Sequence, residues 1–154
     1  MQVPTAIRRD NGFTLIEVLL VVAVIAILAG IVILAVNPSK QLGDARNATR
    51  SADITTIING VYQYSLDNDG ALPTGITTTA TEICATGSSS CTGLVDLSAL
   101  TASGKYLVSM PKDPQCATVC ATNGTGFKVA KDTNGRVTVS APGAEQGKTI
   151  TVTR

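Results

Sequence analysis

A long apolar run near the N-terminus dominates the hydrophobic pattern of this chain. Val18 to Val36 contains 19 residues without a charge. At 1.5 Å per residue, a helix of this length crosses the roughly 30 Å of hydrocarbon in a bilayer. Glu17 interrupts the apolar sequence that follows Gly12. Because a carboxylate inside a spanning helix costs about 2.5 to 3.5 kcal/mol at the bilayer centre and less near an interface, Glu17 is a candidate functional residue that needs a partner.

The pattern changes after Asn37-Pro38, where proline predicts a kink or a short melted turn. From Gln41 to about Asn68, apolar residues recur every three or four positions, which predicts that the same long helix continues outside the membrane as an amphipathic helix. The recurring positions are Leu42, Ala45, Ala48, Ala52, Ile54, Ile57, Ile58, Val61 and Tyr64. The charged residues of this stretch, Asp44, Arg46, Arg50 and Asp53, are expected on its solvated face.

The C-terminal part alternates as strands do. Phe127–Lys131 and Arg136–Ser140 flank Asn134-Gly135, a strong signal for a β-hairpin, and Thr149–Thr153 reads as a third strand. Residues 71–104 are rich in Thr, Ser, Gly and Ala and predict a surface loop with one short helix or turn. The expected fold class is therefore α+β, with a long N-terminal α-helix packed on a small antiparallel β-sheet of three or four strands.

Composition narrows the function classes. The chain has 12 Lys and Arg against 11 Asp and Glu, without a basic stretch, so nucleic-acid binding is not favoured and no direct nucleic-acid site is evident. It has no histidine and only 3% aromatic residues, and no candidate nucleophile is paired with a candidate general base. These facts argue against an enzyme and leave a membrane-anchored enzyme as an alternative from a different class. No catalytic residue is assigned.

Cys84, Cys91, Cys116 and Cys120 make an even number of cysteines in a small domain after a membrane segment, which predicts disulfides in an oxidising compartment. Short separations favour local pairing, Cys84 with Cys91 and Cys116 with Cys120, among the three connectivities possible for four cysteines. A four-thiolate zinc site is the alternative. The cysteine spacing does not suit it, and the chain has no histidine ligand.

The charges around the apolar run predict its orientation. Arg8 and Arg9 precede the run, and no positive charge follows it closely until Lys40. By the positive-inside rule the N-terminus is cytoplasmic and the region after about Asn37 lies outside. An ordinary secretory signal cleaved near Ala35 is the alternative, but its apolar core would be only 7 to 15 residues long.

Six consecutive residues, Gly12-Phe13-Thr14-Leu15-Ile16-Glu17, lie between a short basic leader and the apolar helix. This arrangement resembles the class III signal of type IV pilins and of the pseudopilins of type II secretion and DNA-uptake machines. The resemblance implies that prepilin peptidase cuts between Gly12 and Phe13 and methylates the new amino group of Phe13. It also implies partners: identical subunits in a helical homopolymer, an inner-membrane assembly platform and motor, and the lipid bilayer before assembly.

The proposed cut gives Glu17 a partner. Cleavage would leave a positive amine on Phe13, at the end of a helix whose dipole is already positive there. If subunits stack with a small axial stagger, Glu17 of one subunit reaches the Phe13 amine of the next, and the attraction is strong in a medium of low dielectric constant. The alternative is a tolerated glutamate that reaches the lipid headgroups. Gly12 suits a peptide that enters a protease in extended form.

A second segment resembles the same family more weakly and raises the possibility of a calcium site. Residues 106–114, Tyr-Leu-Val-Ser-Met-Pro-Lys-Asp-Pro, are similar to a stretch of major pseudopilins, in which a nearby loop binds calcium. Asp113 and Asp96 could contribute ligands, but structural turn acids are favoured. Asp67-Asn68-Asp69-Gly70 resembles the start of a calcium loop, yet it lacks the glutamate at the twelfth position and reads as a helix stop. No cofactor or metal is therefore expected, with calcium as a disfavoured possibility.

These features divide the chain into a leader (1–12), a transmembrane and filament-core helix (13–36) and an extracellular head (37–154). The head comprises the amphipathic helix to about 68, the loop 71–104 and a C-terminal sheet region 105–154. The predicted function is a structural subunit of a type IV pilus, a single-pass cytoplasmic membrane protein before assembly and part of a surface filament afterwards. The alternative is a pseudopilin of a type II secretion or DNA-uptake machine, which the segment 106–114 favours.

Overall fold

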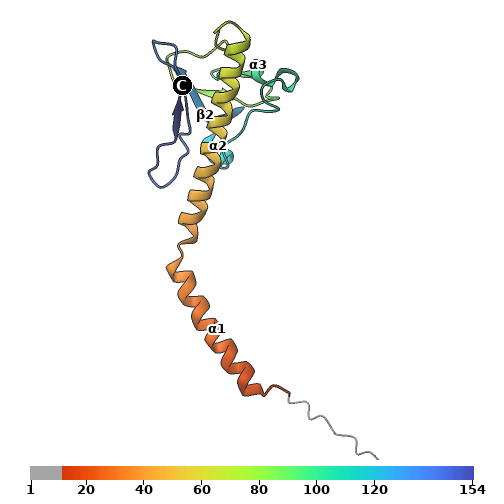
Figure 1. The fold of residues 1–154 in the computed structure, drawn as a ribbon, viewed down its shortest axis with the longest axis vertical. Coiled ribbons are helices and arrows are strands. Elements are labelled where there is room, and N and C mark those ends of the chain that lie inside the picture. Colours follow the sequence, from red (N-terminus) through yellow and green to blue (C-terminus); the bar gives the residue numbers. More distant parts are fainter. Residues whose placement is uncertain (1–11) are drawn as a thin grey trace, which may run out of the picture. The chain divides into compact units, whose positions relative to one another are not determined.

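A computed structural model describes residues 12–154, except for the side chain of Leu34, and Figure 1 shows its elements. The chain divides into two compact units, Met1–Ser39 and Lys40–Arg154. The basic leader, with Arg8 and Arg9, lies outside the described residues. Each unit is considered by itself.

The first unit contains helix α1, Leu15–Ala35, which begins after the N-cap residue Thr14. The helix ends because Val36 adopts extended geometry, with φ of −98° and ψ of 111°. The next helix, α2, begins at Pro38, a position where proline is favoured because its missing N–H would be unpaired in any case. The predicted interruption before Pro38 is therefore present.

The second unit combines α2, Pro38–Asp67, with a four-stranded antiparallel sheet. The strands, in the order β1-β2-β3-β4 across the sheet, are Thr81–Cys84, Gly124–Lys131, Val137–Ser140 and Thr151–Thr153. Three short helical segments, α3 (Ser98–Thr101), η1 (Ala102–Gly104) and α4 (Cys116–Val119), lie in the connections. The α+β prediction and the pilin-like arrangement of helix and sheet are confirmed.

Strand β1 corrects the prediction of a loop over residues 71–104. Its four residues, Thr-Glu-Ile-Cys, are too short to show a clear alternation. They become a strand by pairing with β2, where Glu82 lies opposite Lys128. On the other side, Val95 donates its N–H to the carbonyl of Glu82 at 2.8 Å. Contacts with distant segments therefore define this strand.

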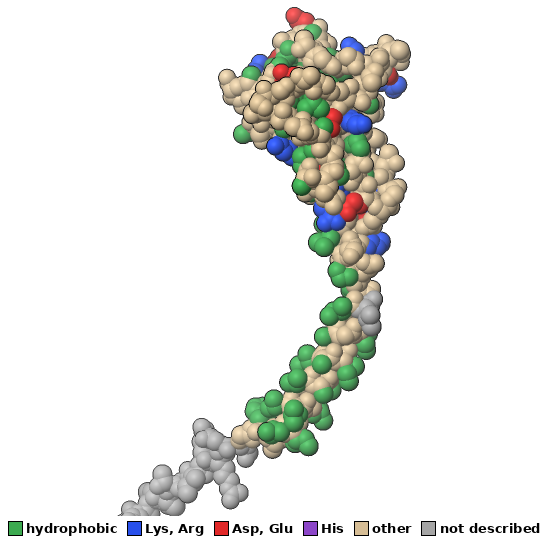
Figure 2. Space-filling view, turned by 180° about the vertical axis from the view of Figure 1, so that it is seen from behind, with side chains coloured by type: hydrophobic (Ala, Val, Ile, Leu, Met, Phe, Trp, Pro, Cys, Tyr) green, Lys and Arg blue, Asp and Glu red, His purple; other side chains and the backbone are tan. Residues whose placement is uncertain are grey.

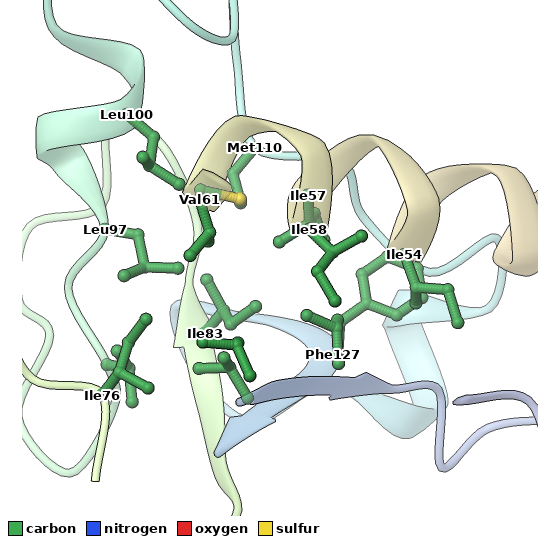
Figure 3. Close-up of a cluster of buried hydrophobic side chains, with 14 of the residues drawn as sticks. Ile54, Ile57, Ile58, Val61, Ile76, Ile83, Leu97, Leu100, Met110 and Phe127 are labelled. Atoms are coloured by element: carbon green, nitrogen blue, oxygen red, sulfur yellow. The ribbon is translucent and has the colours of Figure 1, made fainter. Parts of the chain in front are cut away.

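One hydrophobic core joins the C-terminal half of α2 to the sheet (Figure 3). Ile54, Ile57, Ile58 and Val61 on the helix are fully buried. They pack with fully buried side chains of the strands and the α3 segment, namely Phe127, Val129, Val137, Val139, Ile83 and Leu100.

The N-terminal half of α2 departs from the predicted apolar stripe. Leu42, Ala45, Ala48 and Ala52 are exposed. The buried positions here are Gly43, Asn47 and Arg50, which continue the helical spacing of Ile54, Ile57 and Ile58. The helix therefore keeps one inward face throughout, but this face is polar in its first half and apolar in its second.

Two disulfides close short loops of the head. Cys84 bonds Cys91 after β1, with 5.5 Å between the Cα atoms. Cys116 bonds Cys120 across α4, with 4.7 Å between the Cα atoms. These are the two local pairs that short separations favour.

Gly126 in β2 allows a close approach that predicts a measurable cost of substitution. Its φ is +83°, and an added Cβ would lie 2.8 Å from the Cβ of Asp113. Gly135 has the same φ of +83°, but an added Cβ there meets nothing within 4 Å. Gly135→Ala should cost about 1–2 kcal/mol of stability for the left-handed backbone alone. Gly126→Ala should cost about 1–3 kcal/mol more because it also overpacks the site.

Urea unfolding of the full chain in detergent micelles measures both free energies. Equal losses for Gly126→Ala and Gly135→Ala would contradict the close packing of Gly126 against the Asp113 segment.

Candidate processing and assembly site

Thr14 and Glu17 form a reciprocal cap at the start of α1. The N–H of Thr14 donates to Oε2 of Glu17 at 2.9 Å, and the Thr14 hydroxyl donates to the same oxygen at 2.9 Å. The N–H of Glu17 in turn donates to the Thr14 hydroxyl at 3.3 Å. This capping box satisfies backbone donors that otherwise have no partner in the first turn. Glu17 is thus held at the head of the helix by its own chain.

Gly12 and Phe13 precede this cap and are not part of the helix. The side chain of Phe13 is 89% exposed. A Cβ added to Gly12 would meet nothing within 4 Å. Within the described residues, therefore, no contact requires glycine at position 12, and the Gly12–Phe13 peptide bond lies in an accessible, non-helical segment.

Helix α1 presents apolar side chains around its whole circumference, and Figure 2 shows these side chains gathered along it. Its large apolar residues are between 48% and 78% exposed. Among the described residues, one helix is long and apolar enough to cross a membrane, over Leu15–Ile33. A helix that is hydrophobic on all sides needs a lipid or protein environment that covers it. Glu17 is the only charged residue in its sequence.

The comparisons with known proteins agree with this geometry. Residues 7–33 match the family model of the prokaryotic N-terminal methylation motif. The chain is 37% identical over 62 residues to type II secretion system core protein G of Aeromonas hydrophila, and 38% identical over 61 residues to the protein of that name in Vibrio cholerae. The N-terminal segment of this chain is therefore similar to that of the prepilins, proteins that carry this methylation motif.

The similarity of this chain to these relatives is partial. The aligned region covers 40% of this chain and 42% of the Aeromonas protein, and 40% of each chain for the Vibrio protein. The protein of Escherichia coli with the same name is 33% identical over 63 residues, which cover 41% of this chain and 42% of that protein. The chain thus spans about two fifths of the length of these relatives. No solved structure matches it significantly.

The head of the molecule, residues 40–154, contains a buried ion pair where the sequence predicted a solvated face. Arg50 is fully buried and donates to both oxygens of Asp113, from Nε at 2.6 Å and from Nη2 at 2.9 Å. Nη2 also donates to Oε1 of Gln115 at 2.8 Å. The hydrogen bonds that Arg50 donates to Asp113 are the main cause that raises the pKa of Arg50. The expectation that Arg50 faces solvent is wrong, because its partner Asp113 is 63 residues away in the sequence.

Three of the acidic residues considered as calcium ligands have protein partners in this structure, namely Asp113, Asp96 and Asp67. Asp113 accepts from Arg50, and Asp96 accepts from the N–H of Ser98 at 2.8 Å, as in the start of a helical turn. Asp67 accepts from Lys105 and Tyr106, and the hydrogen bond from Lys105 is the main cause that lowers the pKa of Asp67. Over residues 12–154 the side chains form no group of three or more that could hold a metal ion.

Sequence reasoning missed the Thr14–Glu17 cap, although its signal is present. Thr-x-x-Glu before an apolar run is the pattern of a capping box. The predicted partner of Glu17 was the Phe13 amine of another subunit. Within a single chain the carboxylate binds Thr14 instead. Both Thr14 and Phe13 lie on the N-terminal side of Glu17, so the carboxylate already faces the end at which cleavage would create the amine.

Proposed function

We propose that this protein is a pseudopilin, cleaved between Gly12 and Phe13, methylated on Phe13 and assembled through α1 into a filament of identical subunits in the cell envelope. The observation that carries the proposal is the methylation motif at residues 7–33, with Glu17 held at the head of an apolar helix that its own chain leaves uncovered. The role is structural. The similarity to core protein G of type II secretion favours a pseudopilin over the surface pilus subunit expected first.

The exposed glycine supports the cleavage step. Gly12 has no neighbour that explains its lack of a side chain. The requirement is then set by the enzyme that reads the segment, which must admit an extended backbone. A prepilin peptidase at the cytoplasmic face meets this description.

The apolar surface of α1 supports the assembly step, but it does not supply a driving force alone. Moving α1 from lipid into a bundle of like helices exchanges one apolar environment for another. A charge behaves differently, because an unpaired carboxylate is costly in hydrocarbon and a paired one is strongly attracted to its partner there. Glu17 therefore favours the assembled state once a neighbouring Phe13 amine is within reach, and an assembly motor supplies the remaining work.

Locating the mature chain tests whether the filament stays in the envelope. Cells are sheared to release surface filaments, and both the sheared fraction and the envelope fraction are probed for the processed chain. A pseudopilin is expected in the envelope fraction, and deletion of its gene is expected to block protein secretion. Abundant processed chain in sheared fibres, with normal secretion in the deletion strain, would instead support a surface pilus. The disulfides of the head would also suit an exposed fibre.

Glu17→Ala is expected to leave cleavage intact and to reduce incorporation into filaments by about tenfold or more, which corresponds to about 1.4 kcal/mol or more. The physical reason is that the Phe13 amine of a neighbour then has no carboxylate partner. The measurement is the ratio of filament-bound to membrane-bound mature chain, quantified from cell fractions.

Thr14→Ala is the matched control for this prediction. It removes the cap, at a cost of about 0.5–2 kcal/mol to the helix start, but keeps the carboxylate. Near-normal filaments from Thr14→Ala and few from Glu17→Ala are expected. Equal defects in the two variants would show that capping, rather than the charge, is the role of Glu17 in assembly.

A further inference from the structure

Residues Gly143–Lys148 lie in the connection between β3 and β4, against the N-terminal half of α2, and are called the strap. Its contacts with the helix are polar. Nζ of Lys148 lies 2.6 Å from Oδ1 of Asp44, and Nε2 of Gln146 donates to the carbonyl of Lys40 at 2.6 Å. Gln146 also lies directly against Gly43, where an added Cβ would meet its Nε2 at 2.5 Å.

Glu145 is the centre of the strap, and the helix binds both its side chain and its backbone. Arg46 donates to the two carboxylate oxygens from Nε and Nη2, both at 2.6 Å, and Nη1 of Arg50 adds a third bond at 3.0 Å. The side-chain amide of Asn47 donates to the carbonyl of Glu145 and accepts from its N–H, both at 3.0 Å. One strap residue is thus fixed by three positions of α2.

The helix segment beneath the strap has no apolar anchor. Between Lys40 and Asn47 the buried residues are Gly43 and Asn47, and Leu42 is 58% exposed. The C-terminal half of α2, in contrast, buries Ile54, Ile57 and Ile58 completely. Since the stability of a helix in a protein comes mostly from packing its apolar face, the two halves of α2 depend on different contacts.

Arg50 marks the boundary between these halves. Its guanidinium binds Asp113 and Gln115 as well as Glu145. If the strap moves away, Arg50 keeps the first two partners, whereas Arg46 and Asn47 lose the contacts with Glu145. Opening the strap therefore affects the segment before Arg50 and leaves the hydrophobic core in place, as expected for a local opening unit.

We propose that the strap is a latch that decides whether residues 40–47 of α2 stay helical and fixed to the head or join the connection that precedes them. With the strap closed, this segment is helical and fixed to the head. With the strap open, its eight residues can extend. Because an extended residue spans about 3.4 Å and a helical one 1.5 Å, the connection lengthens by about 15 Å. Opening the latch would thus lengthen the connection between α1 and the head while the hydrophobic core of the head stays folded.

Acid does not operate this latch near neutral pH. The hydrogen bonds from Arg46, followed by those from Arg50, lower the pKa of Glu145 from 4.5 to about 2. A carboxyl group with a depressed pKa contributes stability that is fully present above its ordinary value and is lost as the pH falls toward the depressed one. The contribution of Glu145 is therefore lost only between about pH 4.5 and pH 2.

Amide hydrogen exchange of the full chain in detergent micelles, read by mass spectrometry, tests the latch. Glu145→Ala is expected to raise the exchange rate of amides 42–47 about tenfold or more and to leave amides 54–61 unchanged. Asp132→Ala is the matched control, because it breaks an exposed ion pair with Arg136 at 2.8 Å outside the strap. It should leave both groups of amides unchanged.

Two outcomes would overturn the proposal. One is unchanged exchange over residues 42–47 in Glu145→Ala, and the other is an equal rise over 42–47 and 54–61. If Glu145→Ala fails to fold, the double variant Gln146→Ala with Lys148→Ala decides the question. It removes two exposed contacts at the end of the strap and should raise exchange over 42–47 alone. No rise in that variant, or a rise that includes the core, would equally contradict the latch.

Discussion

Replacing Gly12 with valine is expected to leave the leader attached to essentially every chain. The peptidase must bind the segment before the cut as an extended strand, and a branched side chain at this position obstructs it. The fold itself should not change, because an added Cβ at Gly12 meets nothing within 4 Å. Mass spectrometry of the chain from membrane fractions measures the result directly, since the uncleaved and mature forms differ by the whole leader.

Gly30→Val is the matched control for the leader experiment. Gly30 lies in α1, and an added Cβ there also meets nothing within 4 Å. This control makes the same glycine-to-valine change in the same structural unit, Met1–Ser39, but leaves the residues at the cut unchanged. Normal cleavage is expected in Gly30→Val. Mature chains that begin at Phe13 in the Gly12→Val variant would contradict the proposed processing site.

Arg50→Ala is expected to destabilise the head by about 3–5 kcal/mol, because it leaves the carboxylate of Asp113 buried without its charged partner. Both side chains of the pair are fully buried, so solvent cannot replace the lost contact. Urea unfolding of the full chain in micelles measures the loss. Arg136→Ala serves as the control, since it breaks an exposed ion pair that contributes little to stability.

A double variant separates the ion pair from the space it fills. Arg50→Met combined with Asp113→Leu removes both charges and keeps apolar volume at each position. Such replacements of buried pairs are often neutral or stabilising, so most of the loss should be recovered. A double variant as unstable as Arg50→Ala would show that Gln115 and Glu145, which also bind Arg50, contribute most of the stabilisation.

The features that sequence predicted well depend on neighbours in the chain. The long apolar helix α1 follows from an uninterrupted apolar run, and its end follows from the proline at position 38. The β2–β3 hairpin follows from Asn134-Gly135 between two alternating segments. The Thr14–Glu17 cap belongs to the same group, since both residues lie in one turn, although it was not predicted.

The features that sequence reasoning missed depend on residues far apart in the chain. Leu42, Ala45 and Ala48 fit an apolar stripe, but the sheet does not cover them. Arg50 looked like a solvated residue because its partners, Asp113 and Glu145, lie 63 and 95 residues away. No local pattern reveals such pairs, since the stabilisation that each buried charge receives depends on where the fold places its partner.

Local sequence patterns also do not distinguish between the two types of filament. A surface pilin and a pseudopilin use the same motif at Gly12–Glu17, so this motif does not separate them. The segment 106–114 favoured the pseudopilin, and the similarity to core protein G points in the same direction. Residue 113 illustrates why the segment is hard to interpret alone. A possible metal ligand by sequence, Asp113 is the buried partner of an arginine in the fold.

The sequence by itself determined the long apolar helix and the position of Glu17 at its head, because these depend on apolar length and on residues within one helical turn. Only the tertiary structure decided which face of α2 is inward, that Arg50 and Asp113 are buried together, and that the strap holds the first turns of α2 through Glu145. The physical reason is the same in each case. Polar groups can be buried only where a partner compensates their lost hydration, and that partner is supplied by the fold.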